Sequence, residues 1–130
     1  DLDVVFLATG TGIAPIKAML EQLDRAADQP KPRSVHLLWG GRHSTDLYWQ
    51  PDSGALGLHY TPVLSRADAS WTGARGHVQD ILLATQHDWN RTVVYACGSS
   101  AMIAGARSAL TAAGLPGHRF FSDAFVSSSN

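Results

Sequence analysis

Short uncharged apolar runs alternate along this chain with stretches in which apolar residues recur every three or four positions. The runs suit strands and the recurring pattern suits amphipathic helices. We expect strands at 4–8, 34–39, 58–64, 92–97 and 118–122, and helices at 13–27, 78–84 and 101–113, with a short helical piece at 45–49. Alternation of this kind is typical of repeated strand–helix units. The pattern therefore predicts an α/β fold with an open five-stranded parallel sheet flanked by helices.

The run 4–8 carries no charge, as expected for a strand that is buried on both faces. Within 13–27, Ile16, Leu20 and Leu23 mark one apolar face, and Pro15 suits the first helical turn. Pro62 lies inside the run 58–64, and a proline there predicts an edge position or a bulge.

Composition limits what the chain can be. Its 130 residues are enough for one domain, which we expect over residues 1–126 with a frayed tail at 127–130. The net charge of −1 leaves no global field that would attract nucleic acid, and no apolar run approaches a membrane span. One cysteine excludes an internal disulfide. The chain opens without Met or a basic leader, so we expect a fragment of a longer, cytoplasmic polypeptide.

In open α/β sheets, ligands bind beyond the carboxyl ends of the strands. The first expected strand ends in Gly10, Thr11 and Gly12, followed by Ile13 and a helix. Small residues there let the backbone approach a phosphate, and the helix presents free N–H groups to it. A tight turn that binds nothing is the alternative. Pro15 stands where a dinucleotide fingerprint has its third glycine, which disfavours an ordinary Rossmann dehydrogenase, and no P-loop sequence occurs.

Other strand ends carry further candidates. Arg42 follows the second strand, and Ser65 with Arg66 follows the third; these could hold a phosphate or ribose, or could simply be solvated. Cys97 follows the fourth strand as a potential nucleophile or pocket residue, or as a buried structural thiol. The six histidines show no metal-binding spacing, so we expect no metal site.

Taken together, these segments resemble the nucleotide-binding domain of the ferredoxin–NADP reductase superfamily. Within that superfamily the chain is most similar to reductases that serve oxygenases or the CDP-6-deoxy-glucoseen system. The matching segments, in the order of the family, are Thr9-Gly10-Thr11-Gly12-Ile13-Ala14-Pro15, Trp39-Gly40-Gly41-Arg42, Leu64-Ser65-Arg66, Trp71-Thr72-Gly73, Gly76-His77-Val78, Tyr95-Ala96-Cys97-Gly98 and Phe121-Ser122-Asp123-Ala124-Phe125.

The resemblance implies roles for individual residues. Those at the pyrophosphate and nicotinamide side would be Gly10, Thr11, Gly12 and Ile13, and those around the adenosine would be Arg42, Ser65, Arg66, Arg75 and His77. Cys97 and Gly98 would lie against the nicotinamide, and Phe125 would cover the flavin ring; Cys97 and Phe125 are therefore the residues expected at the reacting atoms.

The resemblance also implies cofactors and partners. Hydride would pass from NADH or NADPH to FAD held mainly by an upstream domain, and single electrons would then pass to an iron–sulfur module, such as a 2Fe-2S cluster, or a similar acceptor protein. The residues leave NADH and NADPH equally open. Two other functions also stay open: a nucleotide-sensing domain without catalysis, and a thiol enzyme that uses Cys97.

Overall fold

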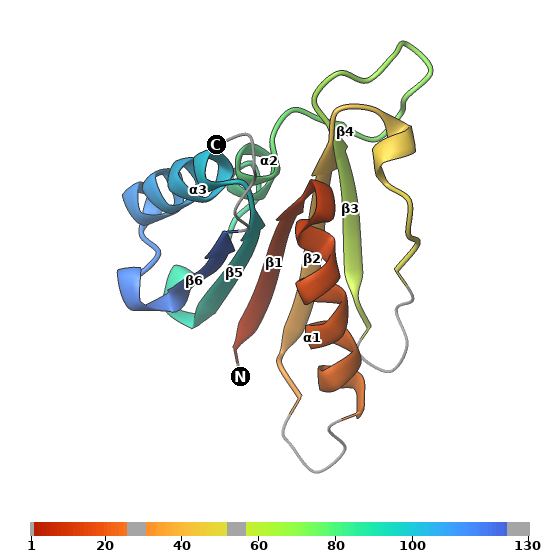
Figure 1. The fold of residues 1–130 in the computed structure, drawn as a ribbon. Coiled ribbons are helices and arrows are strands. Elements are labelled where there is room, and N and C mark those ends of the chain that lie inside the picture. Colours follow the sequence, from red (N-terminus) through yellow and green to blue (C-terminus); the bar gives the residue numbers. More distant parts are fainter. Residues whose placement is uncertain (1, 26–30, 52–56, 125–130) are drawn as a thin grey trace.

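The computed structural model describes residues 2–25, 31–51 and 57–124. They form one parallel sheet in the order β4-β3-β2-β1-β5-β6 (Figure 1). The strands are β1 (Asp3–Thr9), β2 (Ser34–Gly41), β3 (His59–Leu64), β4 (Ala74–Arg75), β5 (Thr92–Gly98) and β6 (Phe120–Ala124). β1, β2 and β5 have the most continuous apolar runs, and residues of each of them pack in the cores on both faces of the sheet.

The helices pack on both faces of this sheet. α1 (Ile13–Arg25) covers one face, and α2 (Val78–Leu83) and α3 (Ser100–Ala113) cover the other (Figure 1). Single 3-10 turns join other elements at Gly10–Gly12, Ser44–Asp46, Trp89–Arg91 and Gly117–Arg119. No helix in the described ranges is long and apolar enough to cross a membrane.

Each face of the sheet has its own core. On the α1 side, Ile16 and Leu20 of the helix pack with Phe6 and the fully buried Trp39. On the other side, Ile103 and Leu110 of α3 pack with strand residues such as Leu7. The apolar periodicity of residues 13–27 thus predicted the correct buried face of α1.

The expectation of five strands is wrong, because the sheet has six. The additional strand, β4, is two residues long and pairs only with Val63 and Leu64 of β3. A strand of that length leaves no hydrophobic pattern in a polar, turn-rich segment. The shortness of β4 also explains how β3 accommodates Pro62. β4 does not extend to this position, so the N–H that proline lacks would have had no partner strand on that side of β3.

Several boundaries also differ. The last strand begins at Phe120, and His118 belongs to the preceding 3-10 turn. The expected helical piece at 45–49 is a single turn at Ser44–Asp46. The end of the first expected helix at 26–27 and the tail at 127–130 lie outside the described residues.

The order of the strands reverses at β1. From β1 the chain first builds β2, β3 and β4 on one side, and it later returns to place β5 and β6 on the other. Beyond the carboxyl ends of the strands at such a reversal lies the crevice in which open α/β sheets bind ligands.

Candidate functional site

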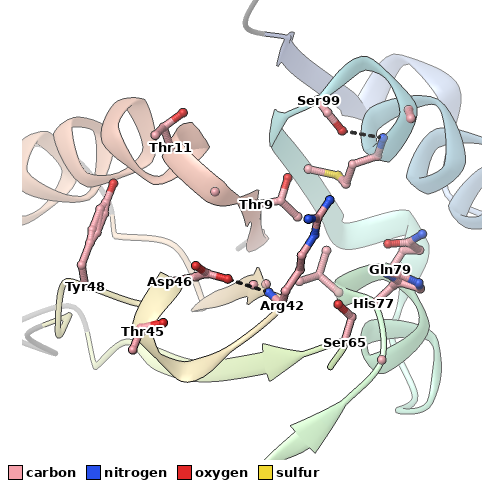
Figure 2. Close-up of a pocket in the computed structure, with 17 residues that line it drawn as sticks. Thr9, Thr11, Arg42, Thr45, Asp46, Tyr48, Ser65, His77, Gln79 and Ser99 are labelled. Carbon is pink, nitrogen blue, oxygen red and sulfur yellow. Dashed lines mark hydrogen bonds between the residues drawn. The ribbon is translucent and has the colours of Figure 1, made fainter. Parts of the chain in front are cut away.

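A cavity of about 840 Å³ lies at that reversal, beyond the carboxyl ends of the strands (Figure 2). Its volume is in the range of pockets that hold cofactors and other small molecules. Five of the residues singled out from the sequence line it: Gly10, Thr11, Arg42, Ser65 and His77. They come from four separate loops, which the sheet brings to one edge.

The turn between β1 and α1 depends on close backbone packing. Gly10 has a φ of +54°, a region that glycine adopts at little cost. A Cβ on Gly12 would overlap the carbonyl of Cys97, and one on Gly98 would overlap the Thr9 side chain. The turn therefore lies directly against the end of β5, and the N-terminus of α1 beside Thr11 is held at the edge of the cavity. Free N–H groups at such a position suit an anion.

The turn after β2 is held by Asp46. Its carboxylate accepts hydrogen bonds from the backbone N–H groups of Arg42, at 3.0 Å, and His43, at 3.1 Å. These backbone bonds hold the pKa of Asp46 below its usual value. Figure 2 shows the Arg42 side chain extending into the cavity. Its guanidinium forms no salt bridge with any residue the structure describes, so the charge is available to a ligand.

The segments on either side of β4 place their polar residues differently. Ser65 of the β3–β4 loop and His77 between β4 and α2 line the cavity, whereas the exposed Arg66 does not. The Arg75 guanidinium donates to the backbone carbonyls of Ala67, Asp68 and Trp71, so it closes its own loop. A sequence motif cannot distinguish an arginine that meets a ligand from one that ties a loop, because both lie in the same polar segment after β3.

Beyond the fourth long strand, β5, Ser99 caps α3 by accepting a hydrogen bond from the Met102 N–H at 3.2 Å, and both residues line the cavity (Figure 2). Cys97 and Gly98 are buried and do not line it, and neither does Ile13 or Gly12. Burial, and secondarily the charge of Asp123, raise the pKa of the Cys97 thiol to about 11. A thiol that stays protonated at neutral pH is a poor nucleophile. Phe125 lies outside the described residues.

In the part of the chain that the structure describes, no group of three or more His, Cys, Asp or Glu side chains could hold a metal ion.

The chain matches the family model of the oxidoreductase NAD-binding domain over residues 6–108. The chain belongs to this family. It is 44% identical to the CDP-6-deoxy-L-threo-D-glycero-4-hexulose-3-dehydrase reductase of Yersinia pestis, across 98% of this chain and 39% of that protein. It is 30% identical to the anthranilate 1,2-dioxygenase electron transfer component of Acinetobacter baylyi, across 96% of this chain and 37% of that protein. The chain thus spans less than half the length of these relatives.

Solved structures share the fold of this NAD-binding domain. The cytochrome P450 reductase GcoB of Amycolatopsis superposes with a TM-score of 0.81 at 23% identity, covering 95% of this chain and 38% of that one. A ferredoxin NADP+ reductase from Neisseria gonorrhoeae, solved with bound FAD and NADP, superposes with a TM-score of 0.72 at 23% identity, covering 94% of this chain and 55% of that one.

The NAD-binding domain also contains cavity residues to which the sequence analysis gave no role. They are Thr9, Gly40, Gly41, Thr45, Asp46, Tyr48, Gly76, Val78, Gln79, Ser99, Ala101 and Met102. Gln79 is notable because its side-chain oxygen Oε1 is buried and has no hydrogen-bond partner among the described residues. The sequence signal that could have identified Gln79 is its position two residues after His77, at the start of α2.

Proposed function

We propose that this chain is the nucleotide-binding domain, over residues 1–126, of a flavin-dependent NAD(P)H reductase that transfers electrons to another protein. The observation that carries the proposal is the cavity at the sheet reversal, where the glycine turn, Arg42 and the unpaired Gln79 oxygen converge. A helix N-terminus and an arginine suit a pyrophosphate, and an amide oxygen suits the donors of a base or ribose.

Within that cavity we assign Thr11 and the backbone around Gly12 to the pyrophosphate, with Arg42 neutralising charge beside it. Ser65, His77 and Gln79 would hold the adenosine end. The nicotinamide would lie toward Cys97 and Gly98 at the end of β5, with Phe125 beyond it. When bound, the nucleotide supplies a hydride to FAD on an upstream domain, and the electrons leave singly to an iron–sulfur or similar acceptor.

The chain's contribution to the reaction is therefore alignment. Gly12 and Gly98 allow the β1–α1 turn to pack on β5, and this packing would set the depth at which the nucleotide lies. A fixed reaction geometry supplies much of the acceleration in a reaction of this type. The 44% identity to a hexulose-dehydrase reductase, against 30% to a dioxygenase component, favours a deoxysugar-forming dehydrase over an oxygenase as the system it serves. We place the protein in the cytoplasm.

An anaerobic visible spectrum of the polypeptide that joins this chain to its flavin domain tests the proposal. We expect flavin absorbance that bleaches on addition of NADH or NADPH, with the more effective nucleotide identifying the donor. Arg42→Ala should retain the flavin but require a higher nucleotide concentration. A polypeptide that retains no FAD, or whose flavin neither nucleotide reduces, would overturn the assignment.

A further inference from the structure

A second cavity, of about 560 Å³, lies at the opposite end of the sheet from the nucleotide cavity. It is lined by Leu83 at the end of α2, by Ala113 at the end of α3, and by the segment 85–89 that leads into β5. The nucleotide cavity is lined by residues at the beginning of the same two helices, which lie together on one face of the sheet (Figure 1). The two cavities share no lining residue, so the second is a separate site.

The charges around the second cavity favour a cation. Among the described residues that line it, His87 and Asp88 are the ionisable ones, and none is Lys or Arg. Oδ1 of Asp88 accepts from the Asn90 N–H at 3.2 Å, whereas Oδ2 lies 3.7 Å from Nε of Arg91, which is too long for a hydrogen bond. Ala113 is the last residue of a 14-residue helix, so the negative end of the α3 dipole is directed to this cavity. A carboxylate and a helix C-terminus both repel an anion.

The pairing of His87 and Thr85 leaves acceptors for a ligand. Nε2 of His87 lies 2.8 Å from the Leu82 carbonyl oxygen and 2.7 Å from the Thr85 hydroxyl. Because a carbonyl oxygen only accepts, Nε2 carries the hydrogen, and in the neutral ring Nδ1 is then an acceptor. The Thr85 hydroxyl donates to the same carbonyl at 3.1 Å. The donors of these two side chains are used within the protein, so a ligand that pairs with them must bring donors of its own.

The half-buried Trp89 ring provides an aromatic wall. Its centroid lies 4.9 Å from that of the His87 ring, with the two planes at 38°. A Cβ on Gly114 would lie 3.3 Å from Cδ1 of Trp89, so the indole is held against the end of α3. Indole is the aromatic ring that attracts a cation most strongly, within about 6 Å of its centroid. A cation in this cavity would therefore meet the carboxylate of Asp88 and the Trp89 ring together.

We propose that the second cavity binds a protonated amine, with Asp88 as its counter-ion and the Trp89 ring as its platform. An alkylammonium ion combines three N–H donors with an apolar chain, and these features match the acceptors and the indole. The inference goes beyond the proposed function and does not rest on it.

Titration of the 130-residue chain with n-butylammonium chloride tests the site, at an ionic strength kept constant with sodium chloride. The indole N–H resonance of Trp89 reports occupancy, and Trp89→Phe identifies that resonance. n-Butanol is the neutral probe of the same chain length. Asp88→Asn removes the charge but keeps an oxygen that can accept from the Asn90 N–H. Asp80→Asn is the matched control, because Asp80 is exposed on α2 and lines neither cavity.

We expect the Trp89 resonance to shift saturably with n-butylammonium and to stay unchanged with n-butanol at the same concentrations. Asp88→Asn should weaken binding at least about threefold, and Asp80→Asn should leave it unchanged. An equal response to n-butanol would assign the cavity to neutral ligands and overturn the inference. Unchanged affinity in Asp88→Asn, or no saturable shift in the wild type, would also overturn it. The comparison of the two probes uses the wild-type chain, so the test does not depend on the folding of a variant.

Discussion

The Gln79 side chain places a buried oxygen where the described residues offer it no hydrogen-bond donor. A buried amide oxygen without a donor costs about 1–3 kcal/mol relative to a paired one. The Oε1 atom of Gln79 is in that position, and the residue lines the cavity. Under the proposed function, the cost would be recovered when a base or ribose donor of the nucleotide pairs with this oxygen.

Replacing Gln79 by Leu should therefore separate stability from binding. We expect the free energy of unfolding to stay level or rise by about 1 kcal/mol, because an unpaired polar atom is removed. Nucleotide affinity should fall by about tenfold, the equivalent of one hydrogen bond. Urea unfolding and calorimetric titration measure the two effects. Gln22→Leu, on the exposed side of α1, should change neither, and a Gln79→Leu variant with unchanged affinity would contradict the assignment.

Arg66 and Arg75 have the same charge, but Arg66 lies in the loop after β3 and Arg75 lies in β4, so they have different surroundings. Arg66→Ala should weaken NADPH binding by about tenfold or more and leave NADH binding nearly unchanged, since an exposed guanidinium can pair with the 2′-phosphate of NADPH. Arg75→Ala should weaken the binding of both nucleotides by the same factor, since it removes three hydrogen bonds that close the loop. Binding titrations with both nucleotides decide this. Selective loss of NADPH in Arg75→Ala would show that the guanidinium leaves its carbonyls to meet the phosphate.

At the scale of elements, the strands that could be predicted from the sequence are those buried on both faces of the sheet. β1, β2 and β5 were expected from their apolar runs, because a strand covered on both faces has few polar positions. β4 was missed because two residues cannot show a periodicity. The strand ends indicated where the cavity would lie, but not which side chains would face it. Whether a residue such as Ile13 faces solvent, ligand or core depends on packing between elements that are distant in sequence.

The β1–α1 turn provides a sharp test of packing. Gly12→Ala should lower the free energy of unfolding by about 1–3 kcal/mol, because the new Cβ would overlap the backbone of Cys97, which cannot move aside as a side chain can. Nucleotide binding should weaken as the turn shifts. Gly117→Ala is the control: its Cβ would meet nothing within 4 Å, and its stability should stay within about 0.5 kcal/mol. Equal stability of the two variants would contradict the close packing.

We expect the stability of the pairing between β2 and β3 to depend on pH. His36 and His59 lie in register and stack at 4.8 Å. Burial lowers the pKa of His36 below 6.5, His59 and His87 add to this, and Asp3 opposes it. Below pH 6.5 the unfolded chain therefore binds the proton first, so stability is lost as the pH falls toward the folded pKa.

Urea unfolding at pH 7.5 and 5.5 should show this loss in the wild type and a smaller loss in His36→Phe. Asp3 does not interfere, because its pKa of about 2 in the fold and 3.8 ordinarily keep it ionised at both pH values. A loss of the same size in His36→Phe would assign the pH dependence to other groups.

At the scale of the whole molecule, the reversal of strand order at β1 gathers loops that are distant in sequence at one edge of the sheet. The cavity lies beyond the strand ends at that reversal (Figures 1 and 2).

Isothermal titration of the 130-residue chain with NADH and with NADPH tests the central claim most directly. We predict one site per chain for at least one of the two nucleotides, with binding weakened at least tenfold by Arg42→Ala and no oxidation of the nucleotide in the absence of flavin. Absence of binding by a folded chain, or binding that Arg42→Ala leaves unchanged, would contradict the assignment of this cavity to a nicotinamide nucleotide.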